Sequence, residues 1–427
     1  MKTITLRLLL FLVVATLLLA AAFVAPSVGA GSTPLPAAAS PPYVVCPVGE
    51  AGGGLVSRLG AFREGGGQGL VTVVDGAPDP IAFDFSESST YRVELAELAE
   101  LGLTPVLIEA DRVAATTYSH AGGAASLAGC LPASPDPVAV MGMSTSAGDG
   151  STLIISNPFA IEAAVQMRGA SEFGDDTPTD LEQVRVPAFT NLEFDFGQIL
   201  TGRASLSFVV RATAGSVVAG MRRTGENDIA SSEAIAGSTE WFFAIPDLGI
   251  DGAIHLRAIG DGDTAFRIDP IGADLLAEAL VEGQLGANEV GVFPLSGFDP
   301  AIGGLVVTTN QPSAAVVVYA GPEARAVSPG ATTVIGEWLV PVSASRSEGQ
   351  NAVWLLNGTD RVVSATITSL EEANARTLQV PAGGTAGAII SNLDGSGASI
   401  IADGPIAAFF GVLGSPGIGM SVAVPLE

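Results

Sequence analysis

The sequence has almost no lysine and very few residues of the kinds that most often carry out chemistry. Lys2 is its only lysine, and its 427 residues include two histidines and two cysteines. A structural zinc site takes about four cysteine or histidine ligands, and these few residues supply no convincing set. We therefore expect neither a bound metal nor another cofactor.

The two histidines are not part of a recognisable hydrolase motif. His120 lies in the polar stretch Tyr118-Ser-His-Ala-Gly-Gly, and His255 lies in the apolar stretch Ala253-Ile-His-Leu. A hydrolase triad needs a base that is oriented by a carboxylate and lies beside a nucleophile, but no Gly-x-Ser-x-Gly motif accompanies either histidine. We expect His120 in a surface loop and His255 in a strand with one polar partner. An exported hydrolase that uses His120 or a carboxylate pair is an alternative, because the distance between acids is invisible in a sequence.

Basic residues are scarce as a class. The chain has 44 Asp and Glu against 18 Lys and Arg, which gives a net charge of −26. Proteins bind nucleic acids and anionic membrane surfaces by neutralising phosphates with basic side chains, so this charge argues against both partners. A solvated acidic surface is the simplest interpretation. Cation binding is the alternative: no acidic turn matches an EF-hand loop, and Asp261 and Asp263 are the weak calcium candidates.

Only one long hydrophobic run is present, and it lies near residue 1. Leu8–Ala25 follows Lys2 and Arg7 and precedes the small residues Ser27–Ala30. This order predicts a secretory signal peptide over residues 1–30, and a run of about 18 residues is also just long enough for an uncleaved membrane anchor. Residues 31–44 form a Pro/Ala linker that cannot pack a core. We expect an exported protein, extracellular or in the cell envelope, that contacts a membrane only through its N-terminal segment.

The two cysteines, Cys46 and Cys130, are an even pair in a chain that we expect to be exported. Such a pair predicts a disulfide. The bond would close a loop of about 85 residues and contribute up to ~4 kcal/mol in the chain-entropy description. A catalytic thiol fits less well, because Cys46-Pro-Val-Gly has no histidine nearby.

Beyond the linker, the sequence divides into four segments of about 95 residues that share features. The segments are 45–135, 136–235, 236–330 and 331–427. Each opens with a predicted β-hairpin, clearest at Asn351–Thr368, where two apolar runs flank the turn Asn357–Asp360. Asn-Gly is a strong hairpin signal because both residues tolerate positive φ. In the third segment we assign this hairpin to Trp241–Pro246 and the strand at Ala253–Ala258.

Two further features recur within the segments. A Val-Pro pair lies near the middle, most clearly at Val186-Pro187 and Val380-Pro381, and it predicts a strand end because proline cannot donate to a ladder. A pair of apolar strands joined by a short turn closes each segment, as in Leu305–Ala315 and Ile400–Ala408. The sequence leaves open whether the segments are beads in a row or pairs that share sheets.

Seven or eight short strands in about 95 residues is the size of an immunoglobulin-like sandwich, whereas a propeller needs about four strands per 40–50 residues. We therefore predict an all-β protein of tandem immunoglobulin-like β-sandwich repeats. Val93–Leu101 and Asp274–Glu282 have leucines at helical spacing and are compatible with short helices. Trp241, Trp338 and Trp354 lie inside apolar runs, which favours core packing over sugar-stacking platforms.

These features resemble a family of secreted actinobacterial proteins of unknown function, of the "large secreted protein" type. The matching residues are Cys46-Pro47 after the linker, Ile154-Ile-Ser-Asn157-Pro158, Trp354-Leu-Leu-Asn357-Gly358 and the closing Asp403-Gly-Pro-Ile-Ala-Ala408. The third segment departs from the pattern, with Ile245-Pro246 in place of Asn-Pro. The resemblance implies an exported β-rich protein and brings no catalytic residues.

The sequence as a whole favours a non-enzymatic protein of the cell envelope or extracellular space, with a structural or interaction role and a protein or polysaccharide partner. A carbohydrate-binding or calcium-dependent adhesion module is the second hypothesis, and the exported hydrolase is the third.

Overall fold

A computed structural model describes residues 43 to 426 apart from short stretches at 49, 52–55, 64–66, 75–79, 86–89, 99–101, 104, 111–112, 122–123, 226–227, 272–278, 299–302, 322–323, 371–374, 392, 394–395 and 415–416. The predicted export signal at 1–30 and nearly all of the linker at 31–44 lie outside the described residues. Within the described part, no helix is long and apolar enough to cross a membrane.

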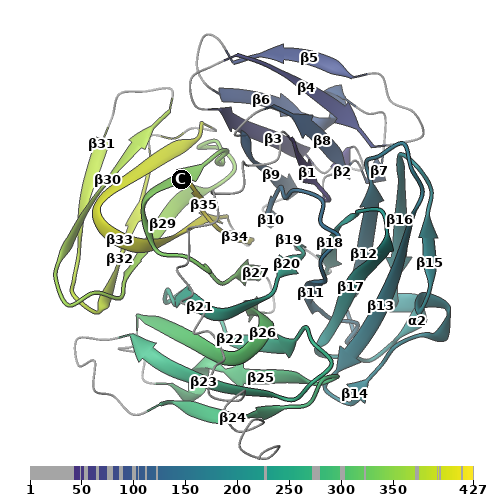
Figure 1. Ribbon diagram of the computed structural model, residues 1–427. Coiled ribbons are helices and arrows are strands. Elements are labelled where there is room, and N and C mark those ends of the chain that lie inside the picture. Colours follow the sequence, from purple (N-terminus) through teal and green to yellow (C-terminus); the bar gives the residue numbers. More distant parts are fainter. Residues whose placement is uncertain are drawn as a thin grey trace, which may run out of the picture. The chain divides into compact units, whose positions relative to one another are not determined.

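The described chain is built from antiparallel strands that form four β-sandwiches, which confirms the all-β, immunoglobulin-like prediction (Figure 1). Each sandwich repeats the same two strand orders. In sandwich 1, one layer runs β1-β8-β4-β5 and the other runs β10-β9-β3-β6. The elements of sandwich 1 are β1 (Tyr43–Cys46), β2 (Glu50–Ala51), β3 (Val56–Arg63), β4 (Gln68–Val73), β5 (Ile81–Asp84), β6 (Thr90–Glu94), η1 (Leu95–Glu97), β7 (Gly102–Leu103), β8 (Val106–Glu109), β9 (Val113–Ala121) and β10 (Ala124–Gly129).

Sandwich 2 has the layers β20-β11-β17-β13-β14, with β15 also on β13, and β19-β18-β12-β16. Its elements are β11 (Val138–Met143), β12 (Gly150–Asn157), β13 (Ala163–Ser171), β14 (Gly174–Asp175), η2 (Thr179–Leu181), β15 (Val184–Val186), β16 (Thr190–Asp195), α2 (Phe196–Ile199), β17 (Leu206–Ala214), β18 (Val218–Thr224), β19 (Ile229–Glu233) and β20 (Ile235–Ala236).

Sandwiches 3 and 4 follow the same order with one difference, a long strand that belongs to both layers. The elements of sandwich 3 are β21 (Ser238–Ala244), β22 (Gly252–Ala258), β23 (Thr264–Ile271), β24 (Val281–Leu285), β25 (Val290–Pro294), η3 (Leu295–Gly297), β26 (Gly304–Ala320) and β27 (Arg325–Pro329). Those of sandwich 4 are β28 (Ile335–Val340), β29 (Gln350–Asn357), β30 (Val363–Ser369), β31 (Ala375–Val380), β32 (Gly384–Ile389), β33 (Ala398–Leu413), β34 (Ile418–Val422) and β35 (Val424–Pro425).

The long strands β26 and β33 correct the predicted closing turns of segments three and four. The early part of β26 pairs with β21 and β23, and its later part pairs with β22 and β27. Between Thr308 and Ser313 the register against β21 shifts. Extra residues of this kind form a bulge that bends a strand, so the chain passes from one layer to the other without reversing.

The short helix compatible with Val93–Leu101 is also corrected. Val93 lies in β6, which pairs with β3, and a 3-10 turn follows at Leu95–Glu97. Residues 99–101 lie outside the described residues. Leu95 is buried while Glu94 is exposed, so pairing with the sheet overrides the helical spacing. Of the second stretch, 274–278 lie outside the described residues, and Val281 and Glu282 belong to β24.

The predicted opening hairpins are not hairpins. β29 pairs with β32 and β33, whereas β30 pairs with β31 and β33. The turn after Asn357 therefore carries the chain from one layer to the other as an arch. Sandwich 2 makes the same crossing between β12 and β13 after Asn157. The strands were predicted correctly and their pairing was wrong, because an Asn-Gly turn fits an arch as well as a hairpin.

A fully buried asparagine holds each of these two arches. Asn357 Nδ2 donates to the carbonyl oxygens of Arg361, Val380 and Pro381 at 2.7, 3.2 and 2.9 Å. Its Oδ1 accepts from the backbone N–H of Thr359. The corresponding Nδ2 of Asn157 donates to Ile161, Val186 and Pro187. The asparagine turn and the Val-Pro pair, which look independent in the sequence, are thus joined by hydrogen bonds. We call this set of hydrogen bonds the asparagine lock.

Replacing Asn357 by alanine should destabilise the protein by about 3 kcal/mol, because buried carbonyl groups then lose their donor. Urea unfolding of N357A against the unchanged protein measures the loss. Gln350→Ala is the matched control, since Gln350 is an exposed amide at the start of the same strand. Equal stability of N357A and Q350A would show that the asparagine lock contributes nothing.

Candidate functional site

Buried ion pairs and hydrogen bonds between polar side chains lie where sandwiches meet. In each sandwich, the strand at one edge of the layer, β10, β19, β27 or β34, is here called the closing strand. The closing strands pack in a cycle, β10 on β19, β19 on β27, β27 on β34 and β34 on β10. Sandwich 4 therefore packs against sandwich 1, although these are farthest apart in the sequence (Figure 1). We call each contact between two sandwiches a seam, and the place where the four closing strands meet the seam centre.

Small side chains let the closing strands approach one another. Ser126 Oγ of β10 lies 3.1 Å from Ser231 Oγ of β19. A Cβ on Gly419 of β34 would lie 3.0 Å from the backbone of Ser126. Glu233 Oε2 accepts a hydrogen bond from the N–H of Gly129 at 2.9 Å. Burial raises the pKa of Glu233, and the backbone donors it accepts from oppose the rise.

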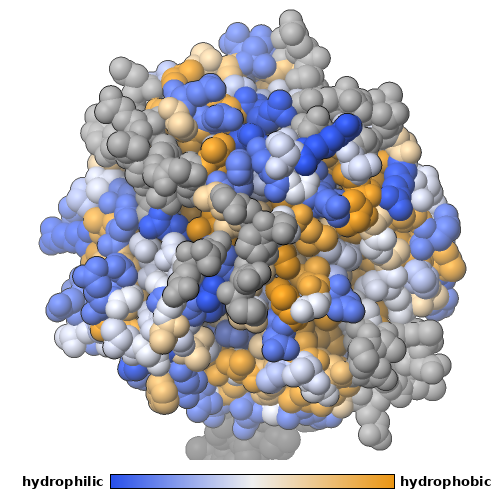
Figure 2. Space-filling view, turned by 180° about the vertical axis from the view of Figure 1, so that it is seen from behind, coloured by the Kyte–Doolittle hydropathy of each residue, from blue (hydrophilic) through white to orange (hydrophobic). Residues whose placement is uncertain are grey.

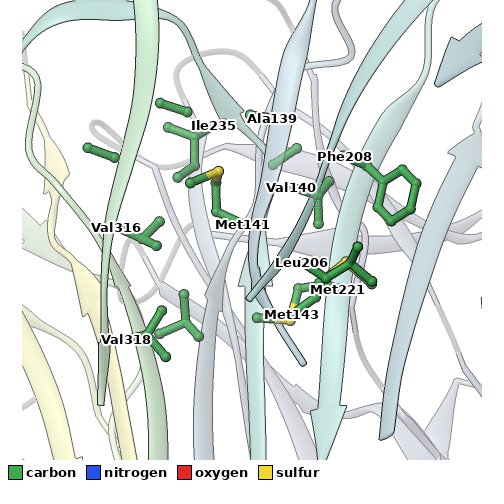
Figure 3. Close-up of a cluster of buried hydrophobic side chains, with 14 of the residues drawn as sticks. Ala139, Val140, Met141, Met143, Leu206, Phe208, Met221, Ile235, Val316 and Val318 are labelled. Atoms are coloured by element: carbon green, nitrogen blue, oxygen red, sulfur yellow. The ribbon is translucent and has the colours of Figure 1, made fainter. Parts of the chain in front are cut away.

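The seam between sandwiches 2 and 3 is largely apolar. Figure 3 shows Met141 and Ile235 of sandwich 2 lying toward Val316 and Val318 of sandwich 3. Gly142 is required here: its φ is +83°, and a Cβ would lie 2.8 Å from a methyl group of Val327. A larger residue would push β27 away. The buried side chains of the two sandwiches form one continuous core.

An ion cluster joins sandwich 4 to sandwich 1. Glu348, in the loop before β29, accepts from Arg58 Nη1 of β3 at 2.6 Å and from the N–H of Ser345 at 2.9 Å. His120 Nε2 lies 3.2 Å from the other carboxylate oxygen, without hydrogen-bond geometry. Burial alone would raise the pKa of Glu348, but the hydrogen bonds from Arg58 and Ser345 and the charge of Arg58 lower it.

A second ion cluster joins sandwich 2 to sandwich 3. Asp149 accepts from Arg223 Nη2 at 2.7 Å and lies 2.9 Å from Arg325 Nε, the first residue of β27. Arg325 Nη1 also donates to Asp228 at 2.6 Å. Burial acts to raise the pKa of Asp149, but the charge of Arg223 and the hydroxyl of Ser144 lower it. Both clusters place a loop carboxylate of one sandwich against an arginine of the next.

The two histidines lie in different sandwiches, His120 in β9 and His255 in β22. The loop prediction for His120 is wrong, because the residue lies in β9 and faces the seam. His255 in β22 is buried beside one polar partner, Ser205 Oγ at 3.2 Å from Nδ1. Burial, with a contribution from the charge of Arg223, lowers the pKa of His255 to about 4. His255 is therefore neutral near pH 7.

Cys46 and Cys130 form a disulfide, with their sulfur atoms 2.00 Å apart. The bond links β1 to the residue after β10, the first and last strands of sandwich 1. The pairing expected from the sequence is thus present, and it fixes the end of a closing strand.

The calcium candidates lie apart from the seam centre, in the loop between β22 and β23. Asp261 forms an ion pair with Arg168 of sandwich 2, and both side chains are largely exposed. Asp263 is exposed, and its carbonyl oxygen accepts from Gln311. Among the described residues, no three His, Cys, Asp or Glu side chains gather as a metal site would require. Calcium binding at Asp261 and Asp263 stays a prediction.

Comparison with known proteins gives only distant similarity. No family model matches the chain, and no curated protein matches it. Among solved structures, the chain is similar to the BSP domain of a biofilm associated protein, with a TM-score of 0.16 and 9% identity over 88% of this chain and 90% of that one. It is also similar to the major pilin of Streptococcus pyogenes, with a TM-score of 0.15 and 9% identity over 67% of this chain and 98% of that one. At such TM-scores the similarities carry no argument about function.

Replacing Glu348 by glutamine should cost about 3 kcal/mol, because the partly buried Arg58 then keeps only the more exposed Glu94, 3.6 Å from its Nε, as a counter-charge. Glu162→Gln is the control, since Glu162 pairs with Arg185 on the exposed surface and such pairs contribute little. Urea unfolding of R58Q, E348Q and the double variant gives the coupling energy. A coupling near zero would contradict the assigned role of the pair.

The lowered pKa of His255 predicts acid sensitivity in a defined window. Above pH 6.5 the imidazole is neutral in both folded and unfolded chains, so stability is at its full value. Between pH 6.5 and about 4 only the unfolded chain takes up the proton, which should cost about 3 kcal/mol. Thermal unfolding of H255Q should show a flatter pH dependence over this range. An unchanged slope would place His255 in a more polar environment. The lowered pKa values of Glu348 and Asp149 add a further loss only below about pH 4.5.

Proposed function

We propose that the protein is an exported, non-enzymatic protein of the cell envelope or extracellular space, with a structural or interaction role. The observation that carries this proposal is the use of its scarce basic residues. Arg58 and Arg325 face carboxylates across seams, and Arg223 supports one of them. These guanidinium groups, which in an enzyme could bind a substrate, here form ion pairs that hold the sandwiches together.

Export is supported by two independent features. Disulfides persist in oxidising compartments outside the cytosol, and Cys46 and Cys130 form one. The sequence predicts a signal peptide or anchor at 1–30 ahead of this bond. We further propose that the chain belongs with the secreted actinobacterial proteins that it resembles.

An interaction role requires an exposed binding surface, and Trp241 and Trp338 are not part of one. Trp241 and Trp338 are buried in the cores, so neither offers a sugar-stacking platform. On the face shown in Figure 2, hydrophilic and hydrophobic residues are interspersed. A partner, whether envelope protein or polysaccharide, would bind such a mixed surface through a local site.

The proposal predicts where the chain is found and what it does there. After fractionation of the producing cells, we expect the protein in the envelope or medium. Because both cysteines are buried, they are tested in urea, where both should stay unreactive to a maleimide until a reductant is added. Purified protein should co-sediment with isolated envelopes, and Gln350→Ala should not change this. A cytoplasmic protein with two reactive thiols would contradict export. Failure to co-sediment would contradict an interaction role.

A further inference from the structure

A small polar cavity lies between sandwiches 2 and 3, away from the two ion clusters. On the outer face of sandwich 2, Gln166 of β13 lies opposite Arg211 of β17, and Arg168 lies opposite Val209. The β22–β23 loop and the β24–β25 loop of sandwich 3 border the same space. The cavity has a volume of about 20 Å³. Its polar lining comes from Gln166, Arg168, Arg211, Arg257, Asp261 and Asn288.

The charge of this cavity is opposite to that of the chain. Three arginines line it, in a protein whose net charge is −26. The nearby carboxylates are Asp261, paired with Arg168, and Asp175, which accepts from Asn288 at 3.3 Å. Arg211 is exposed, and its side chain forms no hydrogen bond or ion pair with any residue that the structure describes. One positive charge is therefore left without a partner at the mouth of the cavity.

Arg257 provides the second observation. Its side chain is 1% exposed. Nη1 donates to the carbonyl and hydroxyl oxygens of Ser207, both at 2.7 Å, and Nη2 donates to the carbonyl of Arg168 at 2.8 Å. The buried Nε–H has no acceptor, and no carboxylate pairs with this guanidinium among the described residues. A buried charge without a counter-ion is costly, so a bound anion would be stabilised here.

Burial lowers the pKa of Arg257 to about 10, with Asp175 opposing the change and Arg168 adding to it. The side chain therefore keeps its charge at neutral pH. Arginine is suited to carboxylates because its planar N–H groups match two oxygens at once.

We propose that this cavity binds the carboxylate of a polyhydroxylated acid, a uronate-type sugar, with Arg211 and Arg168 contacting the charge. The amides of Gln166 and Asn288 flank the arginines and suit hydroxyl groups, which favours a sugar acid over an alkyl carboxylate. The cavity takes only the head group, so the rest of the sugar lies in solvent and can continue into a polymer. In the free protein Asp261 forms an ion pair with Arg168 and therefore competes with the bound carboxylate for this arginine. Naming this partner chemistry rests on the proposed interaction role.

Saturation-transfer NMR titrations of the full chain with glucuronate measure the binding, with glucose, acetate and inorganic sulfate as comparison probes. We expect glucuronate to bind and glucose not to bind. Arg211→Gln should weaken binding roughly tenfold, the loss of one charge-assisted contact. Asp261→Asn should strengthen it, because Arg168 is released. Arg185→Gln, which removes an exposed arginine of the same sandwich outside the cavity, should leave it unchanged.

Equal signals for glucuronate and glucose, or unchanged binding in R211Q, would overturn the site. Weaker binding in D261N would overturn the competitor role of Asp261. Acetate or sulfate binding as tightly as glucuronate would overturn the assignment to sugar acids. All of these variants lie at exposed positions, so we expect their stability to be unchanged. Urea unfolding checks that each of them is folded. Envelope co-sedimentation tests the interaction role separately, so either result can fail alone.

Discussion

The structure depends on how four edge strands are covered. Each closing strand is the last strand of its layer, and an exposed edge offers unpaired backbone groups to any other strand. Here β10, β19, β27 and β34 lie against one another instead, with serine and glycine at the closest contacts. The small residues are needed because the strands meet at close range. The same contacts bring sandwich 1 beside sandwich 4 and allow Arg58 to reach Glu348.

The packing of the sandwiches also determines where charged side chains are paired. Loop carboxylates at two seams face arginines of the neighbouring sandwich, and burial strengthens such contacts while making an unpaired partner costly. In a chain with so few basic residues, three of them, Arg58, Arg223 and Arg325, pair with carboxylates within seams. The arginines of the cavity between sandwiches 2 and 3 differ from these: among the described residues, Arg211 has no acidic partner, and Arg257 is buried without a paired carboxylate.

The strands could be predicted from the sequence because alternation and turn residues are local signals. The pairing could not, because Asn357 and Asn157 sit in turns that suit hairpins and arches alike. Their true partners, the Val-Pro carbonyls, lie 23 to 30 residues away. The third segment shows the same limit: Trp241 lies in β21 (Ser238–Ala244), the first strand of its sandwich, whereas the arch follows Ala258. The missing asparagine at Ile245-Pro246 is thereby accounted for. The seam ion pairs join residues as far as 290 positions apart, and no local pattern marks them.

The central claim is that the four sandwiches close into a cycle, and a distance between the first and fourth tests it most directly. Nitroxide labels on Ala96→Cys and Ser347→Cys, two exposed positions near the Arg58–Glu348 pair, suit pulsed electron paramagnetic resonance because the native cysteines are bonded to each other. The cycle predicts a single narrow distance below about 30 Å. Strands of eight residues span about 27 Å each, so sandwiches strung in a row would place the labels on the order of 80 Å apart, and that result would contradict the account.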